Sequence, residues 1–93
     1  MRLCEDPQCS SVYEPNRFFL DKFPRAERFD VNNTFECTSK RLDDLELKCP
    51  HFIKMDIQGG ELEVLKGARE TLTRTLGLEI EVELLTMYVG QPL

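Results

Sequence analysis

Hydrophobic residues follow two different periods in the second half of the chain. Residues 52–57 form a short, mostly apolar run closed by glycine, which is typical of a buried strand. Between 61 and 76, leucine and alanine recur at steps of three and four, which predicts an amphipathic helix. Between 78 and 85, apolar residues alternate with glutamates, which predicts a second strand. Strand 52–57, helix 61–76 and strand 78–85 together predict one βαβ unit with parallel strands.

The first half of the chain has weaker patterns and contains no glycine. A short helix is predicted at 16–23, between two prolines. Apolar residues alternate from 28 to 37 around Asn32-Asn33, which predicts extended chain with a hairpin turn. A further short helix is predicted at 40–47, capped by one residue of the preceding Thr-Ser pair. We therefore expect a short helix and extended segments before the βαβ unit, within an α/β fold.

Composition limits the classes of function. The 93 residues suffice for one small domain, 1–93, and 41% hydrophobic with 31% charged residues is a globular composition. The net charge of −5 provides no general attraction to nucleic acid. No apolar run approaches the roughly 18–20 residues of a membrane span, and the first residues lack the apolar segment of a signal peptide. We expect a cytoplasmic protein that binds neither nucleic acid nor membrane.

The four cysteines and the single histidine do not have the spacing of a metal site. Zinc sites usually combine two close pairs of ligands, whereas here only Cys49 and His51 are near each other. Reduced thiols are the favoured interpretation, and we expect no metal. A Cys49/His51 ligand pair and a Cys4–Cys9 disulfide remain as alternatives.

Candidate chemistry lies where the predicted strands end, because ligands of open α/β sheets bind beyond the carboxyl ends of the strands. Asp56 ends the first strand, and Glu83 and Tyr88 lie near the end of the second. Asp56 could accept a proton from a substrate or orient a cation. The alternative is a turn-capping acid that binds the N–H groups of the following glycines. Glu61 is interpreted as an acid in the first turn of the helix, favoured there by the helix dipole.

One long stretch resembles the signature of the FkbM methyltransferase family. In that family a strand ending in K-I-D is followed by [V/T]-[E/Q]-G-x-E-L-E-V-L-K-G-A. The residues on this pattern are Lys54, Asp56, Gln58, Gly59, Glu61, Leu62, Glu63, Val64, Leu65, Lys66, Gly67 and Ala68. Gly60 departs from it. Three further segments are similar to the family: Ser10–Asn16 to S-S-L-Y-x-P-N, Thr38–Leu45 to T-x-x-L-D-D-L, and Glu81 with Tyr88–Pro92 to its strand acid and Y-x-G-Q-P ending.

The resemblance implies a Rossmann-like class I fold and methyl transfer from S-adenosylmethionine to an oxygen of a sugar or secondary metabolite. It implies that Asp56 lies on the substrate side of the pocket, that Gln58 orients substrate or cofactor, and that Glu81 supports both. The glycine-rich loop that makes most cofactor contacts in such folds is absent from the sequence. We therefore expect a partial domain, inactive alone, with a sheet edge open to self-association. The alternatives are a non-catalytic α/β module that binds a partner and a degenerate, truncated copy.

Overall fold

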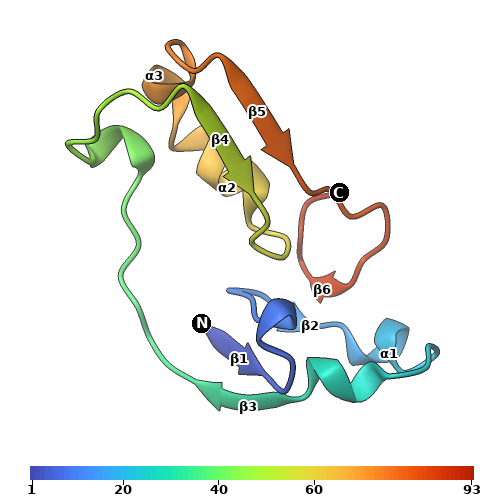
Figure 1. Cartoon of the computed structure of the whole chain (residues 1–93). Helices are drawn as coiled ribbons and strands as arrows, with labels where there is room; N and C mark the ends of the chain where they lie inside the picture. Colours follow the sequence, from blue (N-terminus) through green and yellow to red (C-terminus); the bar gives the residue numbers. More distant parts are fainter.

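Three separate two-stranded sheets organise the chain, whose residues 1–93 are all described by a computed structural model (Figure 1). Two pairs are antiparallel and one is parallel. The antiparallel pairs are β1 (Arg2–Cys4) with β3 (Val31–Thr34), and β2 (Glu14–Pro15) with β6 (Tyr88–Val89); the parallel pair is β4 (Phe52–Met55) with β5 (Gly77–Ile80). The protein is therefore a small α/β structure built from short elements.

The parallel pair carries the predicted strand–helix–strand order with shorter elements. Its register runs from Phe52 opposite Gly77 to Met55 opposite Ile80. The predicted helix 61–76 is interrupted, and forms α2 (Glu61–Lys66) and α3 (Arg69–Leu72) instead. At the interruption, a Cβ on Gly67 would lie 3.2 Å from the Arg41 side chain, so the chain passes close to a neighbouring segment there.

The predicted strands 52–57 and 78–85 are too long at their carboxyl ends. β4 ends at Met55 because the chain then turns, and the last ladder bond runs from the Glu81 N–H to the Met55 carbonyl, 3.0 Å. β5 loses its partner at this point and ends at Ile80. Gly77, which would suit a helix C-cap, begins β5, where an added Cβ would lie 2.7 Å from the Phe52 ring.

The first half departs further from its predicted pattern. The helix predicted at 16–23 is reduced to α1 (Arg17–Leu20). The hairpin turn predicted at Asn32-Asn33 is wrong, because both residues lie inside β3, where Asn33 pairs with Leu3 of β1 and Asn32 lies at a shift in the register. The helix predicted at 40–47 is wrong apart from one 3-10 turn, η3 (Leu42–Asp44), which has no side-chain cap. The remaining 3-10 turns are η1 (Pro7–Cys9) and η2 (Ala26–Phe29).

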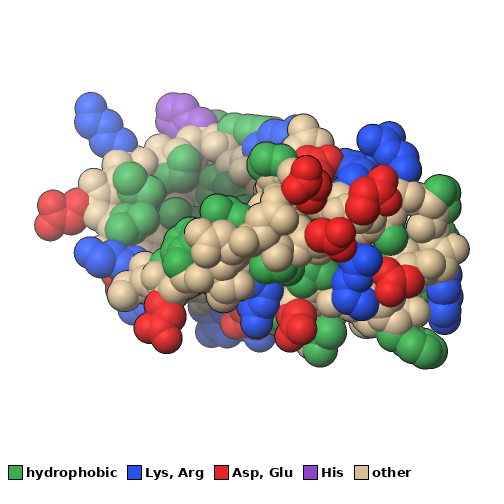
Figure 2. All heavy atoms as spheres, turned by 90° about the horizontal axis from the view of Figure 1, so that it is seen from below, with side chains coloured by type: hydrophobic (Ala, Val, Ile, Leu, Met, Phe, Trp, Pro, Cys, Tyr) green, Lys and Arg blue, Asp and Glu red, His purple; other side chains and the backbone are tan.

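Few hydrophobic side chains are buried, and the largest that is fully buried is an aromatic one. Tyr88 is fully buried, and the other buried hydrophobic residues are Cys4, Cys9, Leu20, Met55 and Ala68. The segment from residue 31 to 41 is exposed along its whole length and arcs around the molecule between β3 and η3 (Figure 1). Figure 2 shows hydrophobic side chains at the surface, interspersed with charged ones. None of the helices is long and apolar enough to cross a membrane.

Candidate functional site

The loop between β4 and α2 has an unusual backbone. Gln58 has a φ of 58° and Gly59 a φ of 100°, so two successive residues lie in the left-handed region. This conformation is unfavourable for a residue with a side chain, such as Gln58, by roughly 1–2 kcal/mol. Other parts of the chain must therefore hold the loop in place, as is typical of functional sites.

Glu61 holds this loop from the start of α2. Its carboxylate accepts the N–H of Ile57 at 2.8 Å and the N–H of Gly59 at 2.9 Å, and the residue is buried. The structure thereby corrects two interpretations drawn from the sequence. Glu61 is more than an acid of the first helical turn, and the turn-capping role considered for Asp56 belongs to Glu61.

Ser11 holds the same loop from the other side. Its hydroxyl donates to the Gln58 carbonyl at 2.6 Å and accepts the Tyr13 N–H at 3.0 Å, and the residue is almost completely buried. The segment Ser10–Asn16 is in turn fixed to the C-terminal part of the chain, since β2 pairs with β6 and the Asn16 side chain donates to the Thr86 carbonyl. Three segments distant in sequence thus meet at this loop.

Tyr88 lies behind the loop and connects it to the N-terminal part. Its hydroxyl has one proton and lies 3.0 Å from the Gln58 Oε1 and 2.9 Å from the Cys9 carbonyl. Burial raises the pKa of this phenol, so Tyr88 stays protonated and can donate. Gln91 accepts the Tyr88 N–H with its side-chain oxygen. The Gln58 amide then donates from Nε2 to the Asp56 Oδ1 at 2.8 Å, so its orientation is fixed at both ends.

Asp56 and Glu81 form a pair of neighbouring carboxyl groups at the carboxyl ends of β4 and β5. A hydrogen bond from the protonated Glu81 carboxyl, followed by the Gln58 amide, lowers the pKa of Asp56. The same hydrogen bond, followed by desolvation and the charge of Asp56, raises the pKa of Glu81. Asp56 is therefore the preferred anion of the pair, and Glu81 the group that retains a proton longer.

These side chains face a cavity of about 530 Å³, within the roughly 300–1,000 Å³ typical of small-molecule sites. Its wall contains Asp56, Gln58 and Glu81, which are the three site residues expected from the sequence. The structure does not place Glu83 or Tyr88 in this wall. Glu83 lines a smaller cavity of about 190 Å³, and burial raises the pKa of its carboxyl group.

Sequence reasoning missed other parts of the cavity wall. Cys9, Arg28, Phe29 and Met87 line it, from η1, η2 and the segment before β6. No motif marked Arg28, Phe29 or Met87. Ser11 lies in the Ser10–Asn16 segment, which resembles a segment of a known family. The sequence did not reveal that this segment holds the loop.

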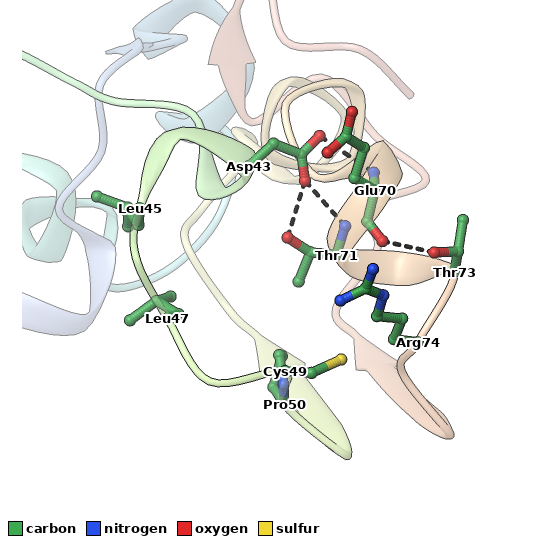
Figure 3. Close-up of a pocket in the computed structure, with 9 residues that line it drawn as sticks. All are labelled: Asp43, Leu45, Leu47, Cys49, Pro50, Glu70, Thr71, Thr73 and Arg74. Atoms are coloured by element: carbon green, nitrogen blue, oxygen red, sulfur yellow. Dashed lines mark hydrogen bonds between the residues drawn. The ribbon is translucent and has the colours of Figure 1, made fainter.

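A second cavity, of about 320 Å³, lies at the opposite end of the parallel strands (Figure 3). Asp43 points from η3 to the start of α3 and accepts the N–H groups of Glu70 and Thr71 and the Thr71 hydroxyl, at 3.1, 2.9 and 2.8 Å. Cys49 and Pro50, just before β4, form part of the wall. Asp43 is thus occupied in satisfying the first N–H groups of a helix, and the cavity lies at the amino ends of the strands, away from the usual ligand position.

The cysteines and the histidine form no cluster. All four cysteines are free, with Cys4 and Cys9 buried and Cys37 and Cys49 exposed. The structure contains no group of three or more His, Cys, Asp or Glu side chains placed to hold a metal ion.

Comparison with known proteins gives one match. The family model described as the methyltransferase FkbM domain matches residues 6–92, which is nearly the whole chain. No curated protein and no solved structure matches it. The family match spans every segment that meets at the cavity, from η1 to the end of β6.

Proposed function

The chain belongs to the FkbM methyltransferase family, and we propose that its residues form the acceptor side of an S-adenosylmethionine-dependent O-methyltransferase. The β4–β5 unit would then be part of a Rossmann-like class I fold. The observation that carries the proposal is the convergence of Asp56, Gln58 and Glu81 on one cavity at the carboxyl ends of two parallel strands. The acceptor is a small molecule with a hydroxyl group, such as a sugar or a secondary metabolite.

Asp56 is the residue proposed to receive the proton of the acceptor hydroxyl. Its lowered pKa keeps the carboxylate ionised at neutral pH, so it is available to accept a hydrogen bond from the hydroxyl and then the proton. Gln58 orients that carboxylate through the 2.8 Å bond from its amide. Glu81 supports the anion by donating to it while protonated.

The donor set also fits the cofactor that the family implies. A carboxylate pair that carries negative charge suits the positively charged sulfonium and ammonium groups of S-adenosylmethionine. When bound, this cofactor supplies an electrophilic methyl group. The five glycines of the chain form no G-x-G pattern, and we assign no residue to the adenosine part. We therefore expect weak cofactor binding by this chain alone, and a titration that gives a dissociation constant of about 1 μM, or roughly −8 kcal/mol, would contradict this.

A second candidate function is that of a non-catalytic module that binds a partner or a second copy of the chain. Its support is the exposure of large apolar side chains on either side of β5, since Leu76 before it and Leu84 after it are each 85% exposed. Both outer edges of the β4–β5 pair are also unpaired. We propose a cytoplasmic location for either function.

The proposed function is tested first by binding. Titration of the ¹⁵N-labelled chain with methyl α-D-glucoside should shift the amide signals of Asp56, Gln58 and Glu81 and leave those of the second cavity, such as Thr71, unchanged. Shifts confined to the second cavity, or none at all, would count against an acceptor site at Asp56.

The second test is methyl transfer by a complete enzyme built on this segment, with radiolabelled S-adenosylmethionine at saturating concentration. Asp56→Asn should reduce transfer by about 100- to 10,000-fold, the usual contribution of a general base, with little change in melting temperature. Glu79→Gln is the matched control, because Glu79 pairs with Lys54 on the neighbouring strand and does not line the cavity. Activity of Asp56→Asn within a few-fold of the unmodified complete enzyme would show that Asp56 is structural.

A further inference from the structure

The cavity that contains Asp56 also contains a fixed cation. Arg28, in η2, lines this cavity together with Asp56. Its guanidinium donates from Nε to the Asp6 Oδ2 at 2.8 Å, and its Nη2 lies 2.7 Å from the same oxygen. Asp6 is itself fixed, because its other oxygen accepts the Gln8 N–H at 3.0 Å and its own N–H donates to the Arg28 carbonyl. The arginine is therefore held in one orientation by both its side chain and its main chain.

Most of the hydrogen-bonding capacity of this guanidinium is unused. An arginine side chain has five N–H donors, and contacts with Asp6 occupy two of them. Both N–H groups on Nη1 and one on Nη2 make no hydrogen bond within the chain, and the side chain is 38% exposed. A guanidinium with free donors in a fixed fork is suited to a carboxylate or a phosphate, which it can bind through two parallel hydrogen bonds.

Phe29, which follows Arg28, adds an apolar side chain to the cavity wall and is held in place by an aromatic contact. Phe29 packs edge-on against the ring of Tyr88, with the centroids 6.0 Å apart. Because Tyr88 also contacts Gln58, the position of this wall is coupled to the loop that carries Asp56. A ligand in the cavity would thus meet a carboxylate, a guanidinium and an aromatic ring next to the guanidinium in sequence.

We propose that the acceptor is an acidic hydroxyl compound, such as a sugar acid or a sugar phosphate, whose anionic group binds Arg28 while its hydroxyl reaches Asp56. This inference rests on the proposed function and narrows its substrate class. A neutral sugar would satisfy the carboxylate and leave the three guanidinium donors to water. Asp6 offsets part of the positive charge, so the expected preference for the acid is about tenfold, in the range of one hydrogen bond to a charged group.

The test compares three probes on the ¹⁵N-labelled chain: D-glucuronate, D-glucose 6-phosphate and methyl α-D-glucoside. At least one acidic probe should bind about tenfold more tightly than the neutral glucoside, and comparison of the two acids shows whether carboxylate or phosphate is preferred. Arg28→Gln should remove this preference, so that the acidic probes bind no more tightly than the glucoside. Arg28→Lys, which keeps the charge and loses the fork, should retain only part of the preference.

Arg17→Gln is the matched control. Arg17 also forms ion pairs with two acids, Asp21 and Asp30, and does not line this cavity, so its replacement should leave the preference intact. If all three probes bind the unmodified chain equally, or if Arg28→Gln keeps the preference, the acidic acceptor is wrong while glucoside binding at Asp56 still supports the proposed function. If no probe shifts the signals of the Asp56 loop, both proposals fail.

Discussion

One region of this protein is held by buried polar contacts, whereas another exposes apolar side chains that nothing covers. The first, here called the polar clamp, consists of Ser11, Gln58, Glu61, Tyr88 and Gln91. Its members are buried or half-buried, and each makes at least one side-chain hydrogen bond. No buried side-chain nitrogen or oxygen in the chain lacks a partner. The second region, the exposed apolar surface, lies in the segment after β5 and consists of Val82, Leu84, Leu85 and Leu93, which are between 56% and 85% exposed.

The difference shows which part of the sequence determines the structure of the site. The polar clamp joins three segments that are far apart in sequence, and it imposes the left-handed backbone at Gln58. The exposed apolar surface has the stronger hydrophobic pattern, yet in this chain nothing packs over it. The site is thus held by specific polar contacts around Tyr88, while apolar surface is available for association.

The largest expected effect comes from removing the centre of the polar clamp. Tyr88→Ala should lower the free energy of unfolding by about 3–5 kcal/mol, because it creates a cavity and leaves the Gln58 amide oxygen without its donor. Leu84→Ala, at an 85% exposed position, should change it by less than about 0.5 kcal/mol. Urea unfolding measures both. Equal losses for the two variants would show that the contrast between the regions is wrong.

The second prediction concerns the exposed apolar surface. If it covers itself by self-association, Leu84→Ser should weaken that association by about tenfold or more, since burial of one leucine contributes about 1.5–3 kcal/mol. Sedimentation over a range of concentrations measures it. Phe18→Ser is the control, because Phe18 is 83% exposed on α1 and is not one of the residues of this surface. A monomer at all concentrations with a cooperative transition at high temperature would contradict the prediction.

The third prediction tests the hold of Glu61 on the loop. Glu61→Gln keeps the size of the side chain and loses one of the two acceptor oxygens that bind the Ile57 and Gly59 N–H groups. We expect a loss of about 1–2 kcal/mol, the effect of leaving a buried donor unsatisfied. Glu63→Gln should cost well under 1 kcal/mol, because its ion pair with Lys66 is exposed. Hydrogen exchange at the Gly59 amide should accelerate in the first variant alone.

The sequence predicts those features that depend on neighbouring residues better than those that depend on residues far away in the chain. The strand at 52–55, the helix start at Glu61 and the parallel partner follow from hydrophobic periods and glycine positions. The strand predicted at 78–85 failed beyond Ile80, because a ladder needs a partner and β4 ends at Met55. The alternation of apolar and polar residues predicts a strand with one apolar and one polar face. It does not specify how long the neighbouring strand is.

The candidate site divides in the same way. Asp56, Gln58 and Glu81 were predictable because they lie at strand ends within a recognisable motif, and the structure brings them to one cavity. Arg28 was not, since it reaches the cavity from a 3-10 turn whose position depends on the pairing of β1 with β3. The sequence also could not show that Glu61, and not Asp56, binds the N–H groups of the loop. The two acids are five positions apart, and the sequence pattern alone allows either of them to do so.

The smallest expected effect is on the pH dependence of stability, which should have opposite signs for an acid at each end of the parallel strands. Burial, followed by the charge of Glu61, raises the pKa of Glu83 above its usual 4.5. Since the folded state then favours the protonated form, this contribution to stability is complete below about pH 4.5 and is lost as the pH rises through the raised value. Asp43 behaves in the opposite sense. The Thr71 N–H lowers its pKa below 3.8, so its contribution is present above that value and is lost as the pH falls.

Glu83→Gln should therefore raise the melting temperature at pH 7 by a few degrees at most, given that 1 kcal/mol corresponds to roughly 4–8 °C in a domain of this size. The difference from the unmodified chain should close near pH 4, where the Glu83 carboxyl is protonated. Asp43→Asn should show the reverse, with a lower melting temperature at pH 7 and a smaller difference in acid, because the unmodified cap is also lost there. Glu46→Gln is the control, since this exposed side chain makes no hydrogen bond or ion pair. If Glu83→Gln stabilises the chain as much at pH 4 as at pH 7, the charge of Glu83 is not the cause of the stabilisation. The carboxyl end of the sheet would then be held by packing.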